Sequence, residues 1–255
     1  PTVMIPTTAG TGSESTPNAI VLFPEKNLKV GIVSPYFMPD RVVLDPELTL
    51  GLPSKLTAST GVDAFCHLLE CFISKKANPM SDMMAREGMR LLLPALPLAY
   101  KNGSDIEARS ATLLAAYYGG ACIAASGTTA IHALSYPLGG TYRVPHGVSN
   151  AALLVPVMSY QKKKIAGRLS EAARAIGLVE AGEGASAEEE ADLLLENLDS
   201  LVKELKIPTS LKDLGVPDGA LASLTEAAYG VRRLLDNNPV ELSREDIRAI
   251  YESVK

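Results

Sequence analysis

The chain has 255 residues, and 47% of them are hydrophobic, so it can bury a substantial core. Its 24 Lys and Arg against 29 Asp and Glu give a net charge of -5, which excludes a broad phosphate-binding surface and nucleic acid as the main partner. The same charge gives no attraction to an anionic membrane, and no apolar run approaches the roughly 18 residues of a membrane span.

The cysteines indicate the cellular compartment of the protein, and the first residue indicates how much of the protein this chain represents. Cys66, Cys71 and Cys122 lack the spacing of a disulfide framework. Such a set indicates reduced thiols, so we expect a cytoplasmic protein. The chain starts at Pro1 rather than Met, and we interpret it as a piece of a longer protein.

Residues 1–50 carry the pattern of short strands separated by turns. Residues 2–6 form the first β-prone run. Two further runs, over residues 19–23 and 29–33, flank the turn-forming sequence Pro-Glu-Lys-Asn, which predicts a hairpin. A last run over residues 41–46 ends at a proline, as strands often do.

A glycine-rich turn, Pro-Thr-Thr-Ala-Gly-Thr-Gly-Ser-Glu over residues 6–14, follows the first of these runs. Its glycines allow close backbone approach, and its hydroxyls and free N–H groups can bind phosphate oxygens. It matches neither the G-x-G-x-x-G fingerprint nor a Walker loop, so an ordinary tight turn explains it equally well.

From Ser54 onward the hydrophobic periodicity becomes helical, and Ser54 can cap the first helix. The stretch over residues 105–125 is apolar nearly all round, which predicts a central buried helix. The sequence therefore predicts a mainly α protein, with an all-α domain over residues 53–255. The other helices are expected at residues 84–100, 129–138, 146–160 and 188–205, and from Ser243 onward.

The chain has only three histidines, and one of them is paired with a carboxylate. Asp63 and His67 lie four residues apart in the first helix, which places both side chains on one face. His132 lies in an apolar helical segment, and His146 lies between a proline and a glycine. Three imidazoles and one carboxylate suit Fe²⁺ or Zn²⁺. Spacing alone supports a metal site and hydrogen-bonded core histidines equally, and the lack of any other histidine favours the metal.

Five segments carry specific motifs: Pro-Thr-Thr-Ala-Gly-Thr-Gly-Ser-Glu (6–14), Gly-Val-Asp-Ala-Phe-Cys-His (61–67), His-Ala-Leu-Ser-Tyr-Pro-Leu-Gly-Gly (132–140), Pro-His-Gly-Val-Ser-Asn-Ala (145–151) and Leu-Leu-Asp-Asn-Asn-Pro (234–239). In this order they closely resemble the iron-containing (group III) alcohol dehydrogenases of the dehydroquinate-synthase-like superfamily. The resemblance covers nearly the whole chain, and the combination of motifs is highly specific.

The resemblance implies a dehydroquinate-synthase-like helical domain that holds a metal, Fe²⁺ or alternatively Zn²⁺. It also implies that residues 1–52 are a remnant of the α/β domain that binds NAD or NADP. The metal ligands at the matching positions are Asp63, His67, His132 and His146. The cofactor-binding residues at the matching positions are Thr7, Thr8, Gly10, Thr11 and Lys29.

This sequence departs from the family pattern in ways that affect function. Members normally carry a Gly-Gly-Gly-Ser phosphate loop and a downstream Asp-x-x-Lys in an N-terminal α/β domain, and this chain has neither. Many members place a second histidine near the reacting centre, where this chain has Tyr136. We therefore expect His132, His146 and Tyr136 to be the catalytic residues. Asp63 is retained, which favours the metal-dependent alcohol dehydrogenases over relatives that reduce maleylacetate.

We expect a metal-dependent, NAD(P)-linked alcohol dehydrogenase that interconverts small alcohols and aldehydes or ketones, present here as a fragment. The isolated fragment is expected to be inactive, because most of the cofactor site is missing. We expect a homodimer or a higher homo-oligomer. Two alternatives stay open, namely a metal-dependent lyase of the same superfamily and a non-catalytic metal-binding domain.

Overall fold

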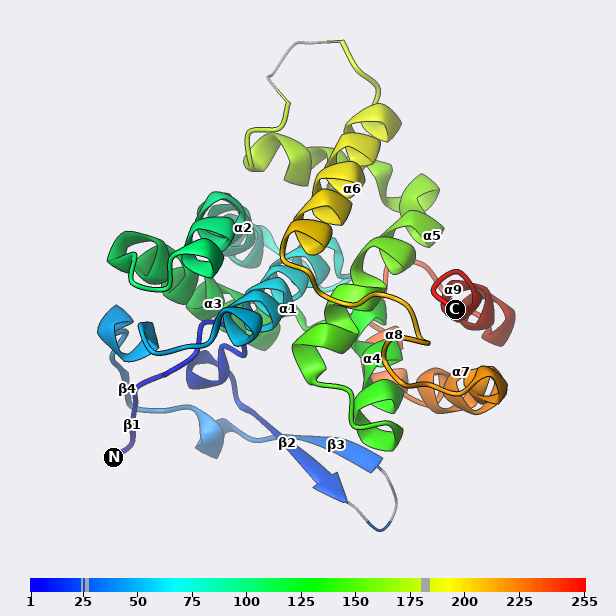
Figure 1. Cartoon of the computed structure of the whole chain (residues 1–255), viewed down its shortest axis with the longest axis horizontal. Coiled ribbons are helices and arrows are strands. Elements are labelled where there is room, and N and C mark those ends of the chain that lie inside the picture. Colours follow the sequence, from blue (N-terminus) through cyan, green and yellow to red (C-terminus); the bar gives the residue numbers. More distant parts are fainter. Residues whose placement is uncertain (24, 26–27, 180–183) are drawn as a thin grey trace.

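The architecture is a helical body with a small β-containing part on one side (Figure 1). The computed structural model describes residues 1–23, 25, 28–179 and 184–255. Within these residues the strands end at Val42 and the α-helices begin at Ser54, which confirms the mainly α fold. The α-helices are α1 (Ser54–Ile73), α2 (Pro79–Lys101), α3 (Ile106–Ser126), α4 (Ala130–Thr141), α5 (His146–Ala175), α6 (Ala187–Glu204), α7 (Leu221–Tyr229), α8 (Arg232–Leu235) and α9 (Arg244–Glu252).

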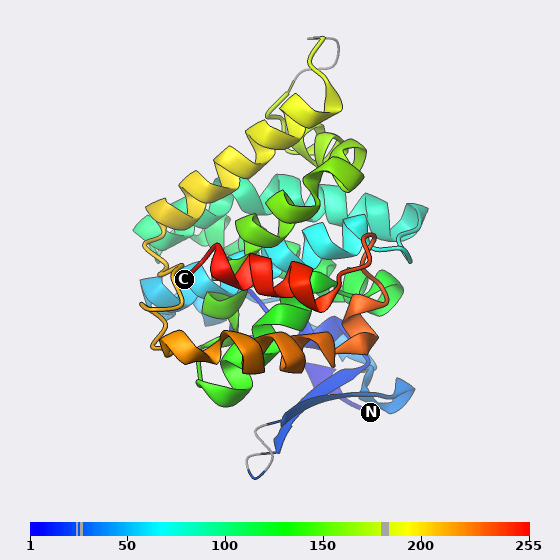
Figure 2. The ribbon, with the colours of Figure 1, turned by 90° about the vertical axis from the view of Figure 1, so that its right-hand side faces the viewer.

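Two small sheets make up the β-containing part. Strand β1 (Val3–Met4) pairs in parallel with β4 (Arg41–Val42), and β2 (Asn18–Phe23) pairs in antiparallel fashion with β3 (Leu28–Val33). The second pair confirms the predicted hairpin, whose turn lies outside the described residues except for Glu25. Figure 2 shows the hairpin and the N-terminus on the same side of the helical body. The division into domains between residues 52 and 53 stays a prediction.

Helix α1 is the centre of the helical body, because every residue from Gly61 to Ile73 is buried. It packs against α2, α3 and α5. Gly61 permits the contact with α2, since a Cβ at this position would lie 2.2 Å from a Leu96 side-chain atom. The helix predicted over residues 105–125 is confirmed as α3, but the prediction that it is central and buried nearly all round is wrong. Helix α3 leaves Ala124 and Ala125 exposed, and much of its apolar character comes from alanines, which bury little area.

The glycine-rich turn docks directly onto the helices. Gly10 is buried, and a Cβ on it would lie 2.6 Å from Thr60 Cβ in α1. Gly12 has a φ of 56°, which favours glycine, and a Cβ on it would lie 2.6 Å from Gly120 of α3. Ser15 Oγ donates a hydrogen bond of 3.0 Å to the carbonyl oxygen of Gly12. The glycines therefore let the turn approach two helix backbones, and this approach fixes its position beside α1 and α3.

The C-terminal half is more helical than the sequence predicts. Helix α5 continues to Ala175, past the predicted end at residue 160, because Ile165 and Leu169 are buried where α5 packs against α6. Helices α7 and α8 were not predicted, since they are short and follow a turn-rich stretch. None of the helices in the described residues is long and apolar enough to cross a bilayer.

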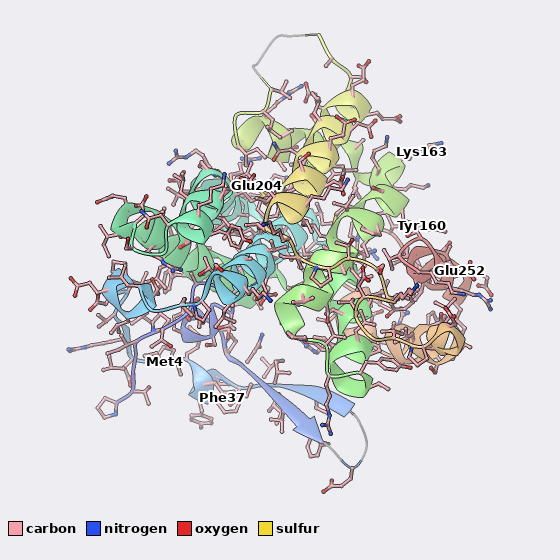
Figure 3. The ribbon with its side chains drawn as sticks, viewed as in Figure 1. Met4, Phe37, Tyr160, Lys163, Glu204 and Glu252 are labelled. Carbon is pink, nitrogen blue, oxygen red and sulfur yellow. The ribbon has the colours of Figure 1, made fainter. Side chains whose placement is uncertain are left out.

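The β-containing part exposes several large apolar side chains. Val3, Ile20 and Val33 are 55%, 49% and 57% exposed. Met4 and Phe37 lie on the same side of the molecule (Figure 3). In the described residues β2 and β3 pair only with each other, so each has an unpaired edge. Exposed apolar edges of this kind pair readily with another chain.

We predict that the chain self-associates through this part. Sedimentation velocity should show species heavier than the monomer. The double substitution Ile20→Lys and Val33→Lys should shift the population toward the monomer, because charge on a strand edge opposes pairing. Leu193→Lys is the control, since Leu193 is 47% exposed on α6, outside this part. A parent chain that stays monomeric at every concentration would contradict the prediction.

Candidate metal centre

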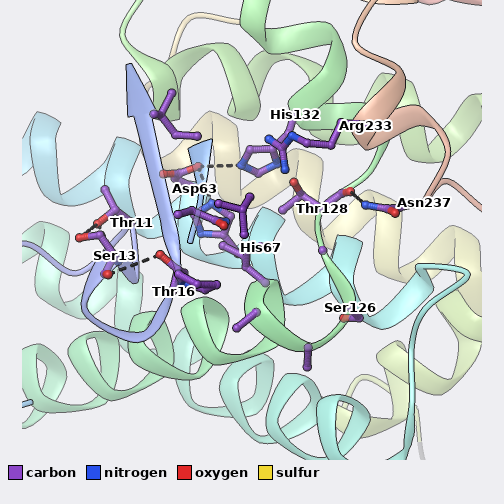
Figure 4. Close-up of a pocket in the computed structure, with 18 of the residues that line it drawn as sticks. Thr11, Ser13, Thr16, Asp63, His67, Ser126, Thr128, His132, Arg233 and Asn237 are labelled. Carbon is purple, nitrogen blue, oxygen red and sulfur yellow. Dashed lines mark hydrogen bonds and ion pairs between the residues drawn. The ribbon is translucent and has the colours of Figure 1, made fainter. Parts of the chain in front are cut away.

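Four side chains from three helices converge at one point in the described part of the chain. Asp63 and His67 come from α1, His132 comes from α4, and His146 comes from α5. Asp63 Oδ1 lies 3.6 Å, 3.5 Å and 3.6 Å from the Nε2 atoms of these three histidines, in chain order. The four ligand atoms all lie within 4.8 Å of one another. Figure 4 shows three of these residues, Asp63, His67 and His132, side by side in the pocket. The structure therefore brings together the four residues that the sequence indicates as ligands.

The spacing and the chemistry of this cluster fit one small divalent ion. In a tetrahedral site with bonds of about 2.1 Å, neighbouring ligand atoms lie about 3.4 Å apart. The separations of 3.5–3.6 Å from Asp63 Oδ1 are close to that value. Three of the four side chains are buried, so water competes little for the position between them. Imidazole nitrogens with one carboxylate oxygen can hold Fe²⁺ or Zn²⁺.

Helix geometry and small residues place the ligands. The two ligands of α1 share a face because they lie one turn apart. Gly119 of α3 leaves room for one of them, since a Cβ there would lie 3.3 Å from His67 Cβ. His146 is the first residue of α5, and a Cβ on the following Gly147 would lie 2.1 Å from the Ser59 carbonyl oxygen of α1. The start of α5 therefore packs directly on the α1 backbone, and this contact positions His146 in the cluster.

The protonation states of the cluster determine how it can take up a cation. Burial raises the pKa of Asp63, but the neighbouring histidines outweigh burial and hold that pKa well below its ordinary value. Burial lowers the pKa of His67 to about 4, so its ring is neutral at pH 7. Burial also opposes charge on His132, but Glu70 and Asp63 raise the pKa of His132 to about 9. A metal that binds at neutral pH must therefore displace a proton from His132.

Two residues that contact the ligands were not predicted from the sequence. Glu70 is fully buried in α1, and its Oε2 contacts His132 Nδ1. It follows His67 by three residues on the same helix face. From that spacing, Glu70 could have been predicted to lie near the ligands. Asn150 is fully buried in α5, where its Nδ2 donates a hydrogen bond of 2.6 Å to Asp63 Oδ1. It lies one turn after the ligand of α5, which is the same kind of signal.

The cluster opens into a pocket of about 630 Å³. Thr11 of the glycine-rich turn lines this pocket, together with Tyr136 and Arg233. Tyr136 lies beside the cluster, with its ring centre 6.2 Å from the ring centre of His146. Its hydroxyl oxygen accepts a hydrogen bond from Arg233 Nη2 at 3.5 Å. A small molecule in the pocket can therefore contact the ligand cluster and the tyrosine hydroxyl together.

The other residues proposed to bind a cofactor are Thr7, Thr8, Gly10 and Lys29. Thr7 is exposed, Thr8 is half-buried and Gly10 is buried against α1, and none of these three described residues is part of the pocket lining. Lys29 lies in β3, but its side chain is outside the described part of the structure. The roles of these residues and of Thr11 in cofactor binding stay predictions.

We predict that His132→Ala lowers the affinity for Zn²⁺ because it removes one of the four ligand atoms. The loss should exceed the roughly 10–100-fold that removal of a ligand's outer partner causes. Competition titration against a chromophoric chelator measures it. Glu190→Gln is the control, since Glu190 is a buried carboxylate that pairs with Arg174 instead. Unchanged affinity and stoichiometry in His132→Ala would contradict the four-ligand site.

We also predict that Zn²⁺ binding tightens as the pH rises from about 7 to about 8.5. The pKa of His132 is raised to about 9, so its ring is protonated in this range and each bound ion displaces one proton. The affinity should therefore rise about tenfold for each pH unit. His67, with a pKa of about 4, adds no dependence here. The same titration across this range checks the slope, and a flat profile would be incompatible with this account.

Known families and sequence relatives match nearly the whole chain. The model of the Fe-containing alcohol dehydrogenase family, C-terminal, matches residues 57–255, and that of iron-containing alcohol dehydrogenase matches residues 1–46. Long-chain-alcohol dehydrogenase 1 of Geobacillus thermodenitrificans is 39% identical, over 99% of this chain and 63% of its own length. The 1,3-propanediol dehydrogenase of Klebsiella pneumoniae is 34% identical, over 98% of this chain and 64% of its own length.

Solved structures share the fold. A 1,3-propanediol oxidoreductase matches with a TM-score of 0.94 and 33% identity, over 99% of this chain and 65% of its own. Sulfoacetaldehyde reductase from Bifidobacterium kashiwanohense, solved in complex with NAD⁺, matches with a TM-score of 0.88 and 32% identity, over 99% of this chain and 64% of its own. The chain thus spans less than two thirds of the length of these relatives. Fold, sequence and the geometry of the cluster agree, and the chain belongs to the iron-containing alcohol dehydrogenase family.

Proposed function

We propose that this chain is the metal-binding part of an NAD(P)-linked alcohol dehydrogenase that interconverts small alcohols and aldehydes or ketones. The observation that supports this most directly is the opening of the four-ligand cluster into a pocket of about 630 Å³, a size suited to small molecules. The names of several relatives agree, among them a long-chain-alcohol dehydrogenase, an NAD-dependent methanol dehydrogenase and a 1,3-propanediol dehydrogenase.

The proposed chemistry depends on the charge balance of the cluster. A divalent ion held there supplies Lewis acidity, which stabilises negative charge on the oxygen of an alcohol or carbonyl compound. Asp63 is ionised, because the neighbouring histidines hold its pKa low. His67 is neutral, because burial holds its pKa near 4. Histidines bind a metal as neutral rings, so a divalent ion and its four ligands would together carry one positive charge. This charge would favour a substrate oxygen that gains negative charge.

Tyr136 is placed to orient the substrate oxygen. Burial raises the pKa of Tyr136 although Arg233 opposes this, so the hydroxyl keeps its proton at neutral pH. The oxygen of this hydroxyl accepts a hydrogen bond from Arg233 Nη2, which leaves its own proton free to point into the pocket. The hydroxyl can therefore donate a hydrogen bond to a reacting oxygen that lies beside the ligand cluster.

The reaction also needs NAD or NADP, and this chain supplies part of that site. Thr11 lines the pocket, so it is the proposed contact nearest to the reacting centre. Thr7, Thr8, Gly10 and Lys29 remain proposed contacts on the same side. The relatives extend beyond the matched part by more than a third of their length. We place the remaining cofactor contacts in a part of the protein outside this sequence.

The buried cysteines and the exposed strands support two further proposals about the protein as a whole. Cys66, Cys71 and Cys122 are buried free thiols, which suits the reducing cytoplasm. The exposed edges of the β2–β3 hairpin suit a homodimer or a larger homo-oligomer. Small alcohols and aldehydes are the substrates in this proposal, in line with the names of two relatives, an NAD-dependent methanol dehydrogenase and a 1,3-propanediol dehydrogenase.

We predict that the 255-residue chain binds metal but produces little or no NADH from short alcohols. The chain contains no Gly-Gly-Gly-Ser loop to anchor a pyrophosphate, and each 1.4 kcal/mol of lost cofactor binding lowers affinity about tenfold. A longer protein that includes the preceding domain should oxidise these alcohols.

The measurement compares NADH formation by the two proteins, each supplied with Fe²⁺ or Zn²⁺ and the same panel of alcohols. Comparable turnover by the 255-residue chain would mean that the cofactor binds entirely within it. An inactive longer protein that binds metal normally would favour the lyase or the non-catalytic domain instead. Phosphate release from candidate lyase substrates then separates those two.

A further inference from the structure

Glu70 of α1 is a fully buried carboxylate that follows the ligand His67 by three residues. A carboxylate in a protein interior is costly unless its oxygens are hydrogen-bonded or paired. Both oxygens of Glu70 have partners, and the two sets of partners differ. Oε1 meets the first turn of α4, whereas Oε2 meets the ring of His132.

The contacts of Oε1 are those of a helix cap. Oε1 accepts hydrogen bonds from Thr129 N at 3.1 Å, Thr129 Oγ1 at 2.8 Å and Ile131 N at 2.7 Å. Thr129 is the N-cap residue of α4, but its own side chain makes no capping hydrogen bond, and the first turn of α4 contains no acidic residue. The first amides of a helix need an acceptor, and negative charge near them is stabilising. Glu70 supplies both from a neighbouring helix.

The contact of Oε2 fixes the ring of His132. An ionised carboxylate can only accept hydrogen bonds, so His132 Nδ1 must carry the proton that the two atoms share. The other ring nitrogen, Nε2, faces the cluster, with Asp63 Oδ1 at 3.5 Å and Asn150 Nδ2 at 3.0 Å, so it is the ring atom that a metal in the cluster would bind. The ring of His67 stacks on that of His132, with centres 4.7 Å apart. Whatever orients His132 therefore restrains a second ligand as well.

We propose that Glu70 is a positioning residue that divides its two oxygens between two tasks. Oε1 starts helix α4, and Oε2 holds His132, the third residue of that helix, in the tautomer and orientation that a metal requires. The folding of α4 and the alignment of its ligand thus depend on one carboxylate. The inference rests on the proposed metal centre and is independent of the alcohol dehydrogenase reaction.

Glu70→Gln separates the two tasks. Glutamine has nearly the same shape, and its Oε1 can still accept from the amides of α4. Its NH₂ group faces His132 Nδ1 as a donor, so the ring must carry its proton on Nε2 instead. We expect a folded protein whose Zn²⁺ affinity is about 10–100-fold weaker. Glu70→Ala removes both tasks and should unfold at a lower temperature than Glu70→Gln.

Nitrogen-15 NMR of ¹⁵N-histidine-labelled protein reads the tautomer directly, and the three histidines make assignment simple. In Zn²⁺-loaded parent protein we expect a protonated Nδ1 and a metal-bound Nε2 for His132. In metal-free Glu70→Gln at a pH where the ring is neutral, we expect protonated Nε2. Glu190→Gln is the matched control, because Glu190 is a buried carboxylate whose partners are Ser170 and Arg174. It should leave both the tautomer and the Zn²⁺ affinity unchanged.

Two results would overturn the proposal. The first is a folded Glu70→Gln protein that keeps the parent's Zn²⁺ affinity and the parent's His132 tautomer. The second needs no variant, and it is a Zn²⁺-loaded parent in which Nδ1 of His132 binds the metal or lacks a proton. Neither readout involves alcohol oxidation, so a failure here would leave the proposed reaction untouched, and an inactive enzyme would leave this proposal untouched.

Discussion

Two carboxylates on one buried face of α1, Asp63 and Glu70, impose the constraint on which the rest of the structure depends. Each is almost entirely removed from water, and each would be destabilising without partners. Glu70 is satisfied by the start of α4, and Asp63 is surrounded by three imidazoles and the amide of Asn150. Satisfying these two groups brings α4 and α5 against α1, and the ligand cluster is the point where the three helices meet.

Small residues make this convergence possible. Glycines at the start of α5 and in the middle of α3 let helix backbones and ligand side chains approach more closely than a Cβ would allow. Close packing at glycines also fixes the position of the glycine-rich turn, because Gly12 packs against Gly120 of α3. That contact brings Thr11 into the pocket beside the cluster. The packing of backbone on backbone thus links the metal-binding helices to the side of the pocket on which we place the cofactor.

Local features of the fold could be predicted from the sequence, because they depend on neighbouring residues. The start of α1 at Ser54, the β2–β3 hairpin and the shared face of Asp63 and His67 all follow from short-range periodicity. The approach of His132 and His146 to that face could not be derived from spacing. It depends on helix packing between distant segments, and only the lack of other histidines and the resemblance to a family indicated it.

The residues that were missed or misinterpreted show what local sequence patterns cannot predict. Glu70 and Asn150 each lie one turn from a ligand, yet their role depends on partners in other helices. The central helix was assigned to residues 105–125 from apolar composition, whereas the structure buries α1, which carries polar residues in its interior face. Charged residues count as polar in a sequence pattern even where the fold buries and pairs them. Composition alone therefore disfavours α1 as the central helix.

X-ray absorption spectroscopy at the zinc edge of the Zn²⁺-loaded chain tests the central claim most directly. The account predicts only nitrogen and oxygen neighbours, at about 2.0–2.2 Å, with the outer-shell scattering of three imidazole rings. A sulfur neighbour at about 2.3 Å would contradict it, because the ion would then sit on a cysteine such as Cys66 rather than on the cluster of Asp63, His67, His132 and His146.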